Sequence, residues 1–196
     1  LCLFILSSFL IAEAKTVVKY GHVGPPVHPQ HKATLAFAKY VNDKTKGEIE
    51  IQVFPLGQLG AERSMTEQVQ TGTLHMTAVT SGVLSNFVPE MGIIELPFIY
   101  PDRETAYKVL DDKEILERFT KFCDAKGFVF IGYTENEFRD ISNSKRPIHK
   151  PEDLKGLKIR VIESPVFIDT FKALGANPTP LPFPEIYNAL QQKVID

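Results

Sequence analysis

The chain has 196 residues, of which 43% are hydrophobic and 23% are charged, a composition typical of a globular protein with a substantial core. Its formal net charge is −2, and no run of lysine and arginine interleaved with aromatic residues occurs, so the sequence argues against a nucleic-acid partner. The length allows one large domain or parts of two.

The beginning of the chain is strongly apolar and ends in the small-x-small triplet Ala12-Glu13-Ala14. This pattern predicts that residues 1–14 are a secretory signal peptide, which is partial because no initiator Met and no basic segment precede it. A transmembrane anchor is the alternative, but the apolar run of about 12 residues is short against the roughly 20 needed to span a bilayer. Cleavage after Ala14 would release an exported protein, which we expect in the periplasm.

The segments after the signal alternate between strand and helix. Residues 16–22 read as a strand, and residues 48–54 alternate strictly between apolar and polar side chains. Between them, apolar residues recur at three- and four-residue spacing, which predicts an amphipathic helix that ends near Gly47. We therefore expect a β-α-β unit with two parallel strands.

A second run of elements follows. We expect a helix over roughly 61–71, a strand over 74–84 and then an irregular connector with several prolines. Asp102 is placed to cap a long helix that ends near Gly127. The continuous apolar run 128–134 predicts a buried strand.

Beyond residue 134 the sequence becomes polar and rich in turns, with two short strand-like pieces before a strand around Arg160. Ser164 and Pro165 suit the N-cap and first positions of a helix. A short extended segment and another helix over 184–193 complete the chain.

This order of elements predicts an α/β fold with mainly parallel sheets. The change of texture divides the chain into a first lobe, 15–134, and a second lobe, 135–196. Because the last residues, KVID, read as the beginning of a strand, we expect the second lobe to be incomplete and the chain to be truncated at its C-terminus.

Catalytic motifs are missing from the sequence. It contains no G-x-S-x-G elbow, no phosphate-binding P-loop and no H-E-x-x-H helix. His28 and His31 are spaced to flank a metal, but no acidic or cysteine partner stands at ligand spacing nearby, and we expect no metal and no cofactor. Asp111 and Asp112 read as solvated turn residues. We therefore expect a binding protein and not an enzyme.

Two arginines stand out as candidates for recognition. Arg139 and Arg160 both lie in strand-like segments, and a guanidinium presents a planar fork that matches a carboxylate. A surface ion pair is the ordinary explanation for an arginine. A surface ion pair does not suffice to explain Arg160, because a permanent charge in the apolar strand DLKGLKIRV requires a counter-anion. That anion is either internal, from Glu163 or Asp153, or a ligand.

Four blocks of the sequence resemble a known family: FPLGQLGAERSMTEQVQTG, SNFVPEMGIIELPFIYPD, NSKRPIHKPEDLKGLKIRV and SPVFIDTFKALGANPTPLPFPEIYNALQQKVID. Together they are similar to the DctP-type solute-binding proteins of TRAP transporters, from about residue 17 to the last residue. The resemblance implies a two-lobed periplasmic-binding-protein fold, type II-like, that closes on an organic anion. It also implies a monomer that delivers its ligand to membrane permease subunits driven by a sodium gradient.

The resemblance also assigns site residues. It makes Arg160 the main carboxylate clamp and Arg139, in ENEFR, a second binding arginine. The other positions that it places at the cleft between the lobes are His22, Ser81, Asn136 and Phe183. Lys32 and Glu67 resemble the members that take sugar acids, although both could equally be surface charges of helices. Two departures from the family pattern, at Glu137 and Pro184, lie near this cleft.

Three functions remain open on the sequence alone. The first is a periplasmic binding protein for a TRAP permease, which would capture a four-carbon dicarboxylate, a sugar acid or a keto acid. The second is a secreted α/β enzyme that acts on an acidic substrate, for which turnover would be the test. The third is a ligand-sensing ectodomain, which would require a membrane or kinase segment after Asp196.

Overall fold

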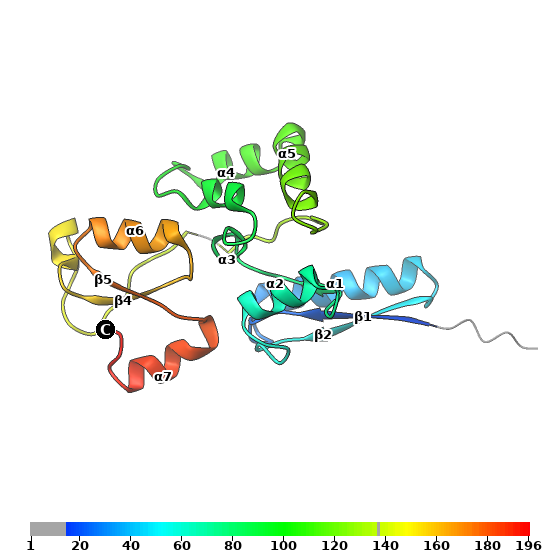
Figure 1. Ribbon diagram of the computed structural model, residues 1–196, viewed down its shortest axis with the longest axis horizontal. Helices are drawn as coiled ribbons and strands as arrows, with labels where there is room; N and C mark the ends of the chain where they lie inside the picture. The colour runs from blue at the N-terminus through cyan, green and yellow to red at the C-terminus, as the bar shows by residue number, and fades with distance from the viewer. Residues whose placement is uncertain (1–14, 137) are drawn as a thin grey trace, which may run out of the picture.

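The computed structural model of the protein describes residues 15–136 and 138–196. The predicted signal peptide lies outside these residues. In these residues there are two separate parallel sheets, with strand order β2-β1-β3 in the first and β4-β5 in the second. Figure 1 shows the two sheets side by side, with a group of helices lying above the space between them. The α/β fold with parallel sheets is thus confirmed, whereas the division at residues 134–135 stays a prediction.

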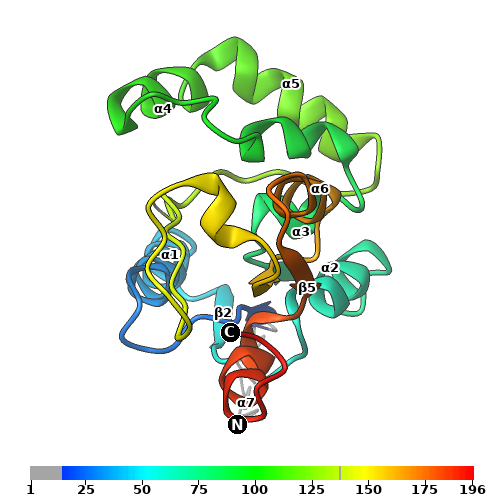
Figure 2. The ribbon, with the colours of Figure 1, turned by 90° about the vertical axis from the view of Figure 1, so that its left-hand side faces the viewer.

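The first sheet forms from the β-α-β unit that the sequence predicts and from a short third strand. Its elements are β1 (Thr16–Gly21), α1 (Pro29–Lys44), β2 (Ile49–Phe54), α2 (Glu62–Gln70) and β3 (Met76–Thr77). Tyr20 interacts with Thr34 of α1, and the next strand residue, Gly21, contacts Met65 of α2. Because neighbouring strand residues point to opposite faces, α1 and α2 cover opposite faces of the sheet, as Figure 2 shows.

The second sheet is smaller. Its elements are η2 (Pro151–Leu154), β4 (Lys158–Val161), α6 (Pro165–Ala173), β5 (Asn177–Pro180), η3 (Phe183–Glu185) and α7 (Ile186–Gln191). The apolar residues of β4 and the preceding turn form a core with α6, made of Leu154, Leu157, Ile159, Val161, Ala176 and the α6 side chains Phe167, Ile168 and Phe171. In Figures 1 and 2, α6 and α7 lie on opposite sides of the two strands.

A group of helices connects the two sheets: α3 (Ser81–Leu84), η1 (Pro89–Glu95), α4 (Arg103–Leu110) and α5 (Lys113–Asp124). Their core contains Val88, Met91, Phe119, Cys123 and Phe128. Cys123 is therefore buried, as the sequence predicts for a core residue. None of the helices in the described part of the chain is long and apolar enough to cross a membrane.

The predicted strand over 74–84 is wrong for most of its length. Only Met76–Thr77 pair with β1, and α3 begins at Ser81. The reason is that β1 ends at Gly21, so the ladder has no further partner after Ala78, whose amide donates to the Gly21 carbonyl. The chain then turns into a short helix.

The predicted long helix after Asp102 is also wrong, because it is divided into α4 and α5. Asp102 caps α4 by accepting a hydrogen bond from the Thr105 amide. The carboxylate of Asp112 accepts from the amides of Glu114 and Ile115, so it begins a new helix. Asp111 and Asp112 therefore serve as turn and cap residues.

Residues 128–134 form no strand in the described structure, contrary to the prediction. Phe128, Phe130 and Tyr133 pack against the helix core, but Val129 and Ile131 are 83% and 66% exposed. The segment is extended with one face buried, and neither sheet provides a neighbouring strand for its backbone. The two strand-like pieces expected between residues 135 and 156 likewise form no ladder.

A close contact between Gly21 and Met65 yields a prediction about stability. A Cβ added at Gly21 would lie 2.5 Å from the Met65 sulfur, and Met65 is fully buried. We expect Gly21→Ala to lower the free energy of unfolding by about 1–3 kcal/mol, the typical cost of overpacking. Chemical denaturation of the intact protein measures this. Gly92→Ala is the matched control, because its added methyl meets nothing closer than 3.5 Å, and equal losses in both variants would contradict the prediction.

Candidate functional site

Arg160 lies near the carboxyl end of β4, and the alternation of the strand decides where its side chain points. Ile159 and Val161 are buried in the core beneath α6, so Arg160 faces the other side. Its Nε donates a hydrogen bond of 2.9 Å to the Leu181 carbonyl. This bond fixes the plane of the guanidinium and leaves its terminal amino groups without a hydrogen bond to any described residue.

No described carboxylate forms an ion pair with Arg160. The Asp153 side chain instead accepts hydrogen bonds from the amides of His149 and Lys150. Burial, and next the charge of Arg139, lower the pKa of the Arg160 guanidinium, while Glu62 and Glu163 act to raise it. Of the two internal partners considered from the sequence, Asp153 is thus occupied elsewhere, and Glu163 acts on Arg160 without pairing with it.

Arg139 lies close enough to Arg160 for the two charges to interact. Its guanidinium carbon is 5.2 Å from the centre of the Phe167 ring, a cation–π contact with the first half of α6. The charge of Arg139 acts on Arg160 and on Glu62. The structure therefore brings together the two arginines that the sequence singled out, although Arg139 comes from an extended segment and not from a strand.

Glu62 is the third charged residue of this group, and it is not among the site residues predicted from the sequence. It is the first residue of α2, and its two carboxylate oxygens accept hydrogen bonds from the amide (3.0 Å) and the hydroxyl (3.1 Å) of Thr80. Burial raises the pKa of the Glu62 carboxyl, although the Thr80 hydrogen bonds and the charges of Arg160 and Arg139 act to lower it. The charges of two guanidinium groups thus act on a half-buried carboxylate.

These three residues lie where the lobes meet, a region that we call the lobe junction. It comprises Glu62 and 80–86 on the first side and Arg139 and 160–167 on the second. A Cβ at Gly82 would lie 3.0 Å from the Phe167 ring and 3.1 Å from Ile162, so the two sides are in tight contact. In Figure 1, α3 lies between the first sheet and α6.

Polar contacts also cross the lobe junction. The Asn86 side chain donates to the Glu163 carbonyl at 2.6 Å. The buried hydroxyls of Ser85 and Ser164 are 3.3 Å apart. Ser164 occupies the N-cap position of α6 as predicted, but its side chain makes no capping hydrogen bond. It contacts the first side of the junction instead.

Three other predicted site residues have different surroundings. Ser81 begins α3, and its hydroxyl donates to the carboxylate of Glu95 in η1. Phe183 is 50% exposed at the start of η3, and the residue after it, Pro184, approaches Gly57 of the first lobe. Asn136 is exposed in the segment that leads to Arg139.

His22 is fully buried, and its Nε2 is 2.9 Å from Nδ1 of His31 on α1. Burial, then the charges of His31 and His28, lower the pKa of His22. His28 is the N-cap of α1 and accepts from the Gln30 amide. The histidines thus fix the beginning of α1 against the end of β1. Within residues 15–136 and 138–196, no group of three or more His, Cys, Asp or Glu residues is placed to hold a metal ion.

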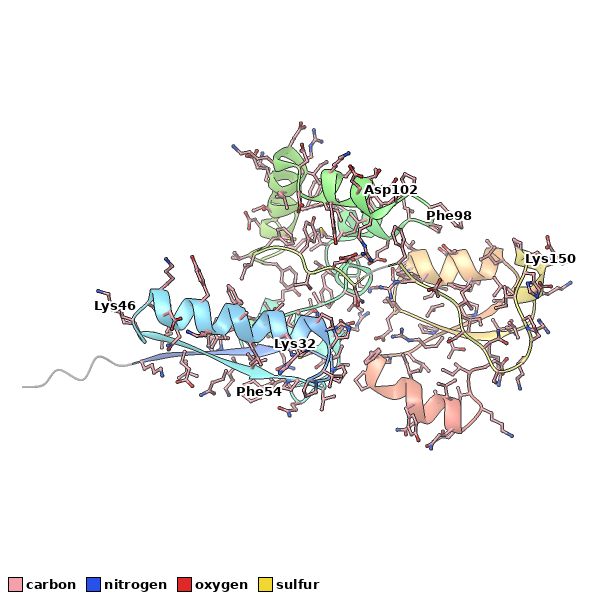
Figure 3. All side chains as sticks on the ribbon, turned by 180° about the vertical axis from the view of Figure 1, so that it is seen from behind. Lys32, Lys46, Phe54, Phe98, Asp102 and Lys150 are labelled. Carbon is pink, nitrogen blue, oxygen red and sulfur yellow. The ribbon has the colours of Figure 1, made fainter. Side chains whose placement is uncertain are left out.

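Lys32 and Glu67 do not belong to the charged group of Arg160, Arg139 and Glu62. Lys32 is exposed on the first turns of α1, at the end of the helix closer to the second lobe (Figure 3). Glu67 lies on the exposed face of α2 and forms an ion pair of 3.4 Å with Arg63. Its surroundings match the alternative explanation, a surface charge of the helix.

The pattern of α2 contains the signal that distinguishes Glu62 from Glu67. Met65, Thr66 and Val69 face inward, and Glu62 precedes them by three, four and seven residues, which is the spacing of one helix face. Glu67 falls outside this spacing. A carboxylate on the buried face of an amphipathic helix needs a partner, and that requirement could have identified Glu62.

The two α/β lobes and the charged group at their junction define a bilobal binding-protein fold. The chain belongs to the bacterial extracellular solute-binding protein family 7, the DctP family, whose model matches residues 20–196. The resemblance noted in the sequence is thereby confirmed.

Individual relatives agree with this family. A solute-binding protein of Verminephrobacter eiseniae is 46% identical over 94% of this chain and 55% of its own length. A TRAP periplasmic solute-binding protein of a Polaromonas species, crystallised with D-erythronate, has a TM-score of 0.89 at 40% identity and is matched over 93% of this chain and 60% of its own. One from Sulfurospirillum deleyianum, crystallised with succinate, gives 0.88 at 39% identity, over 93% and 59%. The chain therefore spans 55–60% of the length of these relatives.

Proposed function

We propose that the protein is the periplasmic solute-binding subunit of a TRAP transporter, which captures an organic acid and delivers it to a membrane permease. Arg160 clamps the carboxylate of the ligand, and Arg139 contacts a second acidic or hydroxyl group. No cofactor takes part. The solved relatives support an organic acid as the ligand, because one was crystallised with D-erythronate and another with succinate.

The observation that carries this proposal is the state of Arg160. Its guanidinium is half-buried, oriented by the Leu181 carbonyl and without an ion-pair partner among the described residues. Removing a charge from water is costly unless an opposite charge compensates it. A bound carboxylate supplies that charge with two parallel hydrogen bonds to the free edge of the fork.

Capture follows from the placement of these charges at the lobe junction. Glu62 begins α2, which covers the first sheet, and Arg160 lies on β4 of the second sheet. A ligand held between them contacts both lobes only when the lobes are together, so it shifts the population toward the closed form. Closure also excludes water and strengthens the charge interactions within the site.

A thermal-shift screen of the intact protein against organic acids tests the proposal. We expect a raised melting temperature with at least one acid, since a ligand that binds only the folded state stabilises it by mass action. Calorimetry then gives the affinity, and the absence of substrate consumption separates a binding protein from an enzyme. A folded protein that responds to no acid with a carboxylate would overturn the proposal.

A further inference from the structure

Three of the five histidines of the chain lie between positions 22 and 31, where β1 leads into α1. His22 directly follows β1 and is fully buried, and its Nε2 is 2.9 Å from Nδ1 of His31 on α1. The centres of the two rings are 5.1 Å apart. We call His22 and His31 the histidine pair. The other ring nitrogen of His22, Nδ1, is buried, and no described residue forms a hydrogen bond with it.

The hydrogen bond between the two rings limits the positions that protons can occupy. A neutral imidazole carries one N–H, so the neutral pair has two hydrogens for its four ring nitrogens. One hydrogen lies between the rings, and the other can occupy the outer nitrogen of His31, whose side chain is half-buried. Whichever ring accepts a further proton, the hydrogen bond persists only if Nδ1 of His22 carries a hydrogen. That hydrogen is a buried donor without a partner, which is costly.

The surroundings of the histidine pair also disfavour a positive charge. Burial, and then the charges of His31 and His28, lower the pKa of His22, and no described carboxylate acts on it. The exposed Lys32, next to His31 on α1, adds a further positive charge. On the opposite side, residues 54–57 contribute backbone hydrogen bonds and have no charged side chain. The pair is therefore neutral in the folded arrangement.

His28 adds a second acid-sensitive contact at the same place. It is the N-cap of α1, and its Nδ1 accepts a hydrogen bond of 3.2 Å from the Gln30 amide. An imidazolium has no acceptor, so a protonated His28 cannot make this contact, and its charge opposes the helix dipole. Protonation of His28 or of the histidine pair thus weakens the first turn of α1.

The backbone of His22 connects the histidine pair to the turn after β2. The Gly57 amide donates to the His22 carbonyl at 3.0 Å, and the Leu56 amide donates to the Gly24 carbonyl at 3.2 Å. Gly57 also lies against Pro184 of η3, since a Cβ added at Gly57 would be 3.4 Å from the Pro184 ring. A movement of His22 therefore reaches a contact between the two lobes.

We propose that the histidine pair is a pH-sensitive switch, which holds the beginning of α1 and the turn 55–57 in place at neutral pH and releases both in mild acid. The inference goes beyond the proposed function and does not depend on it. In the released arrangement the histidines are solvated and titrate near pH 6.5, about the ordinary value for the residue. Because the folded arrangement lowers the pKa of His22, the stability that it contributes is complete above about pH 6.5 and is lost as the pH falls below that value.

Hydrogen exchange of the intact protein without ligand tests the switch. Protection factors, corrected for the pH dependence of the intrinsic exchange rate, are compared between about pH 7.5 and about pH 5.5. We expect protection to fall by about tenfold or more in residues 29–36, because each proton taken up on opening shifts the equilibrium by about tenfold per pH unit below pH 6.5. The amides of Leu56 and Gly57 should lose protection to the same extent. The helix α5 contains no histidine and should keep its protection.

His22→Gln is the main test variant, because its amide keeps a polar group toward His31 but takes up no proton in this pH range. The loss in acid should then disappear at Leu56 and Gly57, and in α1 it should shrink to the contribution of His28. His75→Gln is the matched control. The exposed His75 accepts a hydrogen bond from the Lys19 amide in the same sheet, and its replacement should leave both losses unchanged.

If His22→Gln fails to fold, nitrogen NMR of the imidazole rings in the unmodified protein decides. The inference requires that His22 stays neutral at about pH 5.5 in the folded population. A charged His22 with unchanged protection would overturn it. An equal loss of protection in α5 would also overturn it, because the whole protein would then be unfolding in acid. A loss in residues 29–36 that leaves Leu56 and Gly57 protected would have the same consequence. The proposed function would stand in each case.

Discussion

Arg160→Ala is expected to weaken binding of the organic acid by about 30-fold to several thousandfold, which corresponds to about 2–5 kcal/mol. The loss is large because the ligand carboxylate would enter the lobe junction without its charged partner. The half-buried Glu62 would also lose one of the two guanidinium groups that favour its charged form. Calorimetry with the best acid from the screen measures the effect.

Arg160→Lys separates charge from geometry. A lysine keeps the positive charge but cannot present two parallel donors, nor can it reproduce the Nε bond to the Leu181 carbonyl in the same plane. We expect an affinity between those of the alanine variant and the unmodified protein. Arg118→Ala is the control, because it removes an exposed arginine that pairs with Glu114 on α5. Unchanged affinity in Arg160→Ala would contradict the assignment of Arg160 as the clamp.

Local patterns in the sequence predict the first sheet and the position of Arg160. Strict alternation in 48–54 and the helical spacing before it suffice for β1, α1 and β2, because each is a local property of the chain. Arg160 is also identified from a local pattern in the sequence. It is a permanent charge between two core residues of a short strand, and the structure leaves it without a described ion-pair partner.

Elements whose form depends on distant partners are predicted less well. The segment 74–84 has strand-like composition, but the ladder stops where β1 stops. Residues 128–134 have the apolar content of a buried strand, yet neither described sheet lies beside them to pair with their backbone. The composition of a segment indicates that it can form a strand. Whether a neighbouring strand is present to pair with it depends on the fold.

Glu62 shows the same limit within the site. The spacing of apolar residues in α2 indicates that Glu62 lies on the buried face of the helix, but it does not indicate the partners of Glu62. Thr80 lies 18 residues away and Arg160 is farther still along the chain. The hydrogen bonds exist because the turn after β3 passes the first residue of α2. The spacing of α2 could therefore have favoured Glu62 over Glu67, but the partners of Glu62 could be identified only from the fold.

The tight contact at Gly82 leads to the second large expected effect. A Cβ at this position would meet the Phe167 ring at 3.0 Å and Ile162 at 3.1 Å, and Ile162 is buried. Both neighbours belong to the second side of the lobe junction, so a larger residue would press the lobes apart. We expect Gly82→Val to cost about 1–3 kcal/mol in the closed form. Because the ligand binds the closed form, its dissociation constant should rise by about 5- to 150-fold.

Small-angle scattering and calorimetry together test this prediction. Gly82→Val should have a larger radius of gyration than the unmodified protein when both are saturated with ligand, and a weaker affinity, while Arg160 and Glu62 are unchanged. Gly92→Ala is the control, because Gly92 also faces α6, with Val166 at 3.7 Å, but leaves ordinary van der Waals space for a methyl group. If Gly82→Val bound the ligand as tightly as Gly92→Ala, the contact at Gly82 would not limit closure. The affinity would then depend on the charged group alone, and the lobes would have to meet the ligand in another relative position.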